Sequence, residues 1–136
     1  MKQRLPGILC LLAAWVVCIT AARHIDPIPG FVLRHEAALT TLAEEALAHP
    51  EAEGGFSGVR TIRVWPCREG AFVEFTTGYF PAITGFYYAP TGQPVPYQGA
   101  DTPLTRADGG WVWEHLGNHG TTRHITGCWY AFEAVL

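Results

Sequence analysis

The sequence is poor in charged residues, and lysine is almost absent from it. Lys2 is the only lysine, and charged residues make up 15% of the 136 residues. Once Lys2 and Arg4 are set aside, seven basic residues face twelve acidic ones. This balance excludes a protein that binds the phosphates of nucleic acids, because such proteins carry clustered positive charge. A hydrophobic share of 49% also excludes a disordered chain.

Strong catalytic and metal-binding motifs are missing as well. The sequence contains no Cys-x-x-Cys, His-Glu-x-x-His, nucleophile-elbow or Walker-type pattern, and no internal repeat. Its length suits one domain. We therefore expect no cofactor and no metal, and the sequence assigns no catalytic residue.

An uncharged, apolar stretch dominates the N-terminus. No charged residue falls between Arg4 and Arg23, and the stretch itself covers residues 5–22. Its length lies between that of a signal-peptide core and that of a spanning helix. Residues 1–22 are therefore expected to be either a signal anchor, which holds a single-pass protein in the cell membrane, or a signal peptide, whose removal gives a secreted protein. Because positive charges precede the stretch, both alternatives place the rest of the chain outside the cytoplasm.

Helical spacing of apolar residues begins shortly after this stretch. Residues 23–31 are predicted to be a linker, because Pro27 and Pro29 restrict their neighbours. An amphipathic helix is predicted to follow and to end near Pro50, and it opens a domain that covers residues 32–136. Its apolar face consists of Val32, Leu39, Leu42, Ala43, Ala46 and Leu47.

The remainder has the pattern of antiparallel strands, with short β-branched and aromatic runs between glycine turns. A loop of about 20 residues with three prolines interrupts them, a length that favours a functional surface. The predicted fold is α+β: an apolar membrane or signal helix, then one helix packed on a meander of about five strands, as in a cystatin-like roll. The predicted strands cover residues 59–65, 71–77, 85–89, 111–115 and 128–135.

Three runs of glycine and aromatic residues resemble known sequences. They are residues 85–90 (GFYYAP), 109–113 (GGWVW) and 125–133 (ITGCWYAFE). Together they resemble uncharacterised short proteins of Gram-positive bacteria that have an N-terminal membrane segment and a small extracytoplasmic domain. The resemblance implies a location and no activity.

Two cysteines fall in the predicted domain, Cys67 and Cys128. In an extracytoplasmic domain thiols tend to oxidise, so a disulfide between them is predicted. The alternative is a pair of free thiols.

Histidines and glutamates supply the candidates for catalysis. Glu114, His115, His119 and His124 lie close together in sequence, and a metal-dependent enzyme or small hydrolase would use them. Their spacing matches no zinc signature, and a solvated turn between two strands explains them more simply. Glu74, Glu114 and Glu133 each interrupt an aromatic strand, which the alternation of a half-solvated strand also explains.

The aromatic residues support a third class of function, which is binding. Trp111 and Trp113 must share one strand face, and with Tyr87 they form a candidate ligand face beside the proline-rich loop, residues 90–110. The predicted function is a membrane-tethered or secreted module that binds a protein or a cell-envelope ligand without catalysis. An accessory subunit of a membrane complex is a further alternative, in which residues 5–22 pack on partner helices.

Overall fold

The structure, a computed structural model of the chain, describes residues 26–136. These residues form one α-helix, α2 (Pro27–Ala48), one 3-10 helix, η1 (Tyr97–Gly99), and a single antiparallel sheet of seven strands. The strands are β1 (Thr61–Cys67), β2 (Gly70–Gly78), β3 (Ile83–Tyr88), β4 (Thr105–Ala107), β5 (Gly110–His115), β6 (Asn118–Thr126) and β7 (Trp129–Val135).

Helix α2 begins earlier than the sequence suggests. The predicted linker was wrong over its last five residues, because Pro27 and Pro29 stand in the first turn of the helix. A proline is tolerated there, since the first backbone N–H groups of a helix have no intrahelical acceptor. Asp26 caps the helix: its carboxylate accepts a hydrogen bond from the Ile28 N–H at 3.0 Å and also pairs with Arg123.

The sheet follows the order β1-β2-β3-β7-β6-β5-β4. The α+β class is thus confirmed, but the sheet has seven strands rather than about five. Strand β4 has only three residues, and β6 covers the histidine-rich segment that was predicted to be a turn. Strand β6 could not be predicted because its sequence is polar. Its strand conformation comes from its pairing with β5 and β7.

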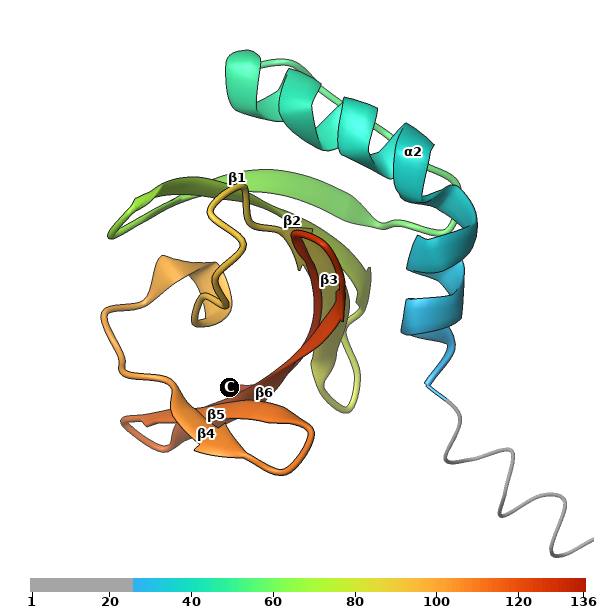
Figure 1. Cartoon of the computed structure of the whole chain (residues 1–136). Helices are drawn as coiled ribbons and strands as arrows, with labels where there is room; N and C mark the ends of the chain where they lie inside the picture. Colours follow the sequence, from blue (N-terminus) through green and yellow to red (C-terminus); the bar gives the residue numbers. More distant parts are fainter. Residues whose placement is uncertain (1–25) are drawn as a thin grey trace, which may run out of the picture.

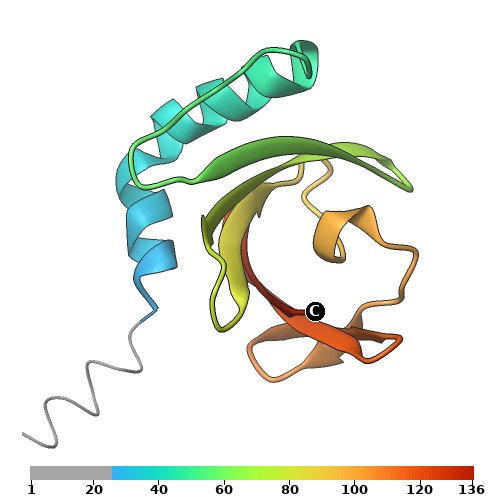
Figure 2. The same cartoon turned by 180° about the vertical axis from the view of Figure 1, so that it is seen from behind.

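The sheet curls away from α2 and around η1 (Figures 1 and 2). The helix therefore covers the outer, convex face, while η1 lies inside the curl. In the predicted layout a single helix covers the one buried face of the sheet, whereas here both faces are buried, each by a different element. The outer core between α2 and the sheet consists of Val32, Leu39, Ala43, Val73, Phe75, Phe86 and Trp129.

Residues 1–25, which include the predicted membrane or signal segment, lie outside the described part of the chain. Within residues 26–136, no helix has the length and apolar character needed to span a bilayer.

Candidate functional site

The inner face of the curled sheet carries an uninterrupted row of polar and aromatic side chains. Strand register places Arg63 opposite Glu74, Glu74 opposite Tyr87, Tyr87 opposite Tyr130, and Tyr130 opposite His124. The row crosses β1, β2, β3, β7 and β6 at one level. Because side chains alternate between the faces of a strand, all five residues belong to the same face.

The predicted aromatic ligand face belongs to this inner side. Trp111 pairs with Thr122 and Trp113 pairs with Gly120, so both indoles share one face, as predicted. That face is not open, however. Only 2% of Tyr87 and 6% of Trp113 are exposed, whereas Trp111 is half-buried. The guanidinium of Arg106 lies 4.6 Å from the centre of the Trp111 ring and covers it.

Segment η1 is the element that fills the curl. The Tyr97 ring stacks on Trp113 with a 6.2 Å centroid distance and a 6° interplanar angle. Gly99 has φ +67, and a Cβ there would lie 2.1 Å from the Pro66 carbonyl oxygen. Glycine is therefore needed for two reasons, the left-handed backbone and the close approach to β1. Segment η1 is therefore closely packed against the inner face of the sheet.

A chain of hydrogen bonds fastens the loop before η1 to the sheet. The Val95 N–H donates to the Tyr87 hydroxyl at 3.0 Å, and this hydroxyl lies 2.7 Å from the Thr122 hydroxyl. Since the Thr122 hydroxyl donates to the Ala131 carbonyl at 3.2 Å, Tyr87 donates to Thr122. The proline-rich loop is therefore held in one position by buried groups.

Glu74 is a buried carboxyl at the base of η1, with 3% of its surface exposed. Burial raises its pKa to about 7, and hydrogen bonding from Trp65, Thr76 and the Gln98 backbone together with the charge of Arg63 offsets only part of that rise. The Thr76 hydroxyl lies 3.5 Å away, and the buried Trp65 indole nitrogen has no hydrogen bond of good geometry. These weak contacts explain why burial dominates.

The sequence singled out Glu74 together with Glu114 and Glu133, and strand alternation predicts a solvated position for all three, but the structure buries Glu74 alone. Glu114 and Glu133 are exposed on the outer side of the sheet, as strand alternation predicts. Glu74 alternates in the same way with Val73 and Phe75, so its place on the face of the sheet that points away from α2 could be predicted. Its burial could not be predicted, because it depends on η1 covering the inner face.

A cleft of about 760 Å³ opens beside η1, between the β1–β2 turn and the proline-rich loop. Arg68, Glu69 and Asp101 supply charges to its walls, while Val95 and Leu104 supply apolar surface. Four prolines among the lining residues restrict the backbone on both sides. They are Pro66, Pro94, Pro96 and Pro103.

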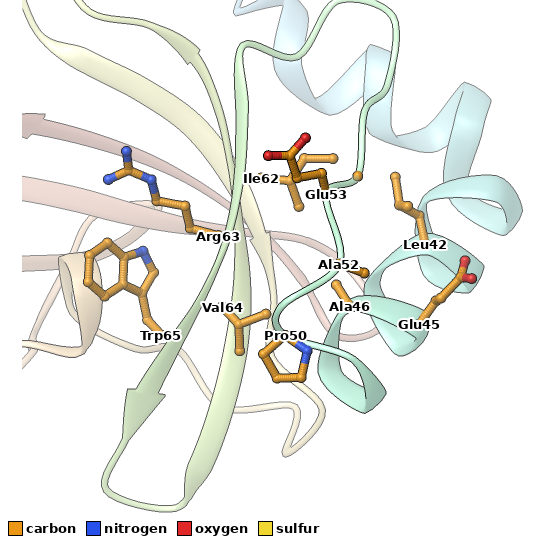
Figure 3. Close-up of a pocket in the computed structure, with 11 residues that line it drawn as sticks. Leu42, Glu45, Ala46, Pro50, Ala52, Glu53, Ile62, Arg63, Val64 and Trp65 are labelled. Atoms are coloured by element: carbon orange, nitrogen blue, oxygen red, sulfur yellow. The ribbon is translucent and has the colours of Figure 1, made fainter.

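A second pocket, of about 340 Å³, lies between α2, the loop after it and β1 (Figure 3). Ile62 and Val64 point from β1 toward α2, whereas Arg63 and Trp65 leave the strand on the other side. The pocket is thus bounded mainly by side chains that belong to the packing of α2 on the sheet. It offers fewer polar groups for recognition than the larger cleft.

The histidine cluster is dispersed by the strand geometry. Glu114 and His119 stand opposite each other on β5 and β6. His124 lies five residues further along β6, on the other face and about 17 Å away along the strand. His115, at the end of β5, is exposed. Within residues 26–136 no group of three or more His, Cys, Asp or Glu residues could hold a metal ion.

Cys67 and Cys128 are free thiols in the structure, so the predicted disulfide is not formed. Strands β2 and β3 separate β1 from β7, which puts the two residues about 14 Å apart along the sheet, beyond the ~7 Å that a disulfide spans. Cys67 lines the cleft, and the Cys128 thiol lies 3.8 Å from the Pro90 carbonyl oxygen. The sequence could not show this separation, because it follows from the order of the strands.

Comparison of the chain with protein-family models, with curated proteins and with solved structures finds no match. The resemblance to short membrane-associated proteins of Gram-positive bacteria therefore stays a prediction.

Proposed function

We propose that the domain is a non-catalytic binding module that holds its ligand in the cleft between the β1–β2 turn and the proline-rich loop. The observation that carries this proposal is the construction of the cleft, in which prolines and the buried Tyr87 network fix both walls before any ligand arrives. A preformed site loses little conformational entropy on binding.

The walls of the cleft suit a peptide-bearing ligand, such as an extended segment of an envelope protein. Arg68 and Glu69 from the β1–β2 turn, and Asp101 from the proline-rich loop, offer partners of both signs for backbone and side-chain groups. Val95 and Leu104 offer apolar contact. The ligand face predicted from Tyr87, Trp111 and Trp113 supports this site from beneath, because it anchors the loop that forms one wall.

The location of the module is the second part of the proposal. The uncharged stretch of residues 5–22 holds the chain in the cell membrane as a signal anchor, and the domain lies outside the cytoplasm. Cleavage after Ala22 would instead give a secreted protein. Protease added outside spheroplasts is expected to digest the domain, whereas protection equal to that of a cytoplasmic control would contradict the location.

The alternatives receive less support from the geometry. A metal-dependent enzyme would need Glu114, His115, His119 and His124 around one point, and the two faces of β6 keep His119 and His124 apart. An accessory subunit of a membrane complex is compatible with the fold, but no described feature favours it over a binding module.

The two thiols provide the test, because Cys67 lines the cleft and Cys128 does not. The rate of alkylation of Cys67 relative to Cys128 is measured in intact cells, where the ligand is present, and in the purified full-length chain. A ligand in the cleft is expected to lower this ratio in cells several-fold. Replacing Arg68 and Asp101 by alanine is expected to return the ratio in cells to the value of the purified chain.

An equal ratio in cells and in the purified chain would contradict the proposed site. A ratio that is low in cells but unaffected by the two substitutions would place the protecting contact elsewhere on the domain.

A further inference from the structure

Large apolar side chains are exposed at one end of the curled sheet. Strand β2 ends, β3 begins, β7 ends and β6 begins at this end, since Ile83 and Gly120 both pair with Ala134. The β2–β3 and β5–β6 turns therefore project beyond the same edge, on either side of the end of β7. We call this set the apolar rim; it consists of Tyr79, Phe80, Leu116, Val135 and Leu136.

The two most exposed side chains of the apolar rim make almost no contact with the rest of the domain. Phe80 is 93% exposed and Leu116 is 90% exposed, and both stand at the tips of turns. Among residues 26–136, the other exposed large apolar side chains are only Leu33 and Val112. Single exposed apolar residues are ordinary, but several on one edge mark an interaction surface.

The chain outside the described part indicates what covers this surface. The uncharged stretch ends at Ala22, and only three residues separate it from Asp26, the N-cap of α2. The Cα atoms of Ala22 and Asp26 are therefore at most about 14 Å apart. With the stretch in a bilayer, as in the proposed function, the start of α2 must lie close to the membrane surface.

The start of α2 and the β2–β3 turn lie on the same side of the domain. Both views place them on the lower side, and the far end of α2 on the upper side (Figures 1 and 2). The edge chemistry also suits a membrane interface: the Tyr79 ring lies 6.0 Å from the Arg60 guanidinium, a pairing of an aromatic ring with a cation that can reach lipid phosphates.

We infer that the apolar rim inserts into the headgroup region of the bilayer that holds the chain, with Phe80 and Leu116 as the two insertion points. This inference rests on the proposed membrane tether. It gives the domain a fixed orientation, with the rim toward the lipid. Such shallow insertion of a few apolar side chains is weak alone but effective beside a permanent anchor, since the anchor removes the cost of association.

Spin labels on the full-length chain in phosphatidylglycerol and phosphatidylethanolamine vesicles test the orientation. The four native cysteines are replaced by alanine, and single cysteines are introduced as Phe80→Cys, Leu116→Cys and, for control, Ala48→Cys at the far end of α2. Labels at 80 and 116 are expected to collide more with lipid-soluble oxygen than with a water-soluble nickel complex. The label at 48 should show the reverse preference.

A second variant tests whether the two insertion points act together. With Phe80→Asp, the label at 116 is expected to shift toward the nickel complex, while circular dichroism stays unchanged because both side chains are exposed. Nickel access at 80 equal to that at 48 would overturn the inference, and so would low collision with both reagents, which would indicate contact with a second copy. If the chain fails to float with the vesicles after a carbonate wash, the tether itself is wrong.

Discussion

The buried carboxyl of Glu74 leads to a prediction about stability and pH. Burial raises its pKa in the folded state from 4.5 to about 7. Between these two pH values the folded chain holds a proton that the unfolded chain has lost, so the free energy of unfolding falls as pH rises. Below the window both states are protonated, and above it both are ionised. The full loss amounts to about 3 kcal/mol.

Replacing Glu74 by glutamine keeps the shape of the protonated acid and removes the titration. The variant is expected to match the parent chain near pH 4.5 and to be more stable by up to about 3 kcal/mol above pH 7. Urea unfolding of the full-length chain in detergent, followed by the near-ultraviolet circular dichroism of its tryptophans, measures the difference at each pH. Other titrating groups cancel in that difference, since the two chains share them.

The exposed Glu133 on β7 provides the matched control, and Glu133→Gln is expected to change the free energy of unfolding by less than about 0.5 kcal/mol at either pH. Parallel pH profiles for the parent chain and Glu74→Gln would refute the reasoning, because they would mean that Glu74 has the same pKa in the folded chain as in the unfolded chain. A variant less stable at high pH would show that the carboxylate makes stronger hydrogen bonds than its geometry indicates.

Two further substitutions test the attachment of the proline-rich loop. Gly99→Ala is expected to cost several kcal/mol, because its Cβ would meet the Pro66 carbonyl oxygen, whereas Gly92→Ala, at the same φ of +67 with nothing within 4 Å, should cost about 1 kcal/mol; equal melting temperatures for the two variants would argue against the close contact. Tyr87→Phe leaves the Val95 N–H without its acceptor and is expected to cost about 1 to 3 kcal/mol and to speed exchange of the Val95 amide hydrogen, and unchanged exchange would show that another group holds the loop.

Elements with strong periodicity could be predicted from the sequence. The apolar spacing of α2 and the alternation along β2, β3 and β7 depend on local pattern, and apart from the earlier start of α2 these elements lie within two residues of their predicted bounds. The shared face of Trp111 and Trp113 follows from the same rule and is confirmed by the strand register. The early start of α2 required knowledge of its cap, which only the contacts of Asp26 reveal.

Features that depend on pairing between distant segments could not be predicted. Strand β6 is polar, and its strand conformation comes from its neighbours β5 and β7. Glu74 follows the alternation of a half-solvated strand, yet it is buried because η1 fills the curl. The same element covers the aromatic face that was predicted to be open. The candidate site is therefore the cleft beside the proline-rich loop and not the surface of the tryptophans.

The strand order also bears on how the chain folds. Every adjacent pair of strands is joined by a short connection except β3 and β7, for which about 40 residues separate Tyr88 from Trp129. The chain thus contains two local meanders, β1 to β3 and β4 to β7, which can form hairpin by hairpin at low entropic cost. The long loop that carries η1 joins these two meanders. The β3–β7 ladder can form only after this loop has brought the two meanders together. We expect this ladder to be the last to form and the step that sets the folding rate, so the loop that shapes the cleft also governs when the two halves of the sheet become one.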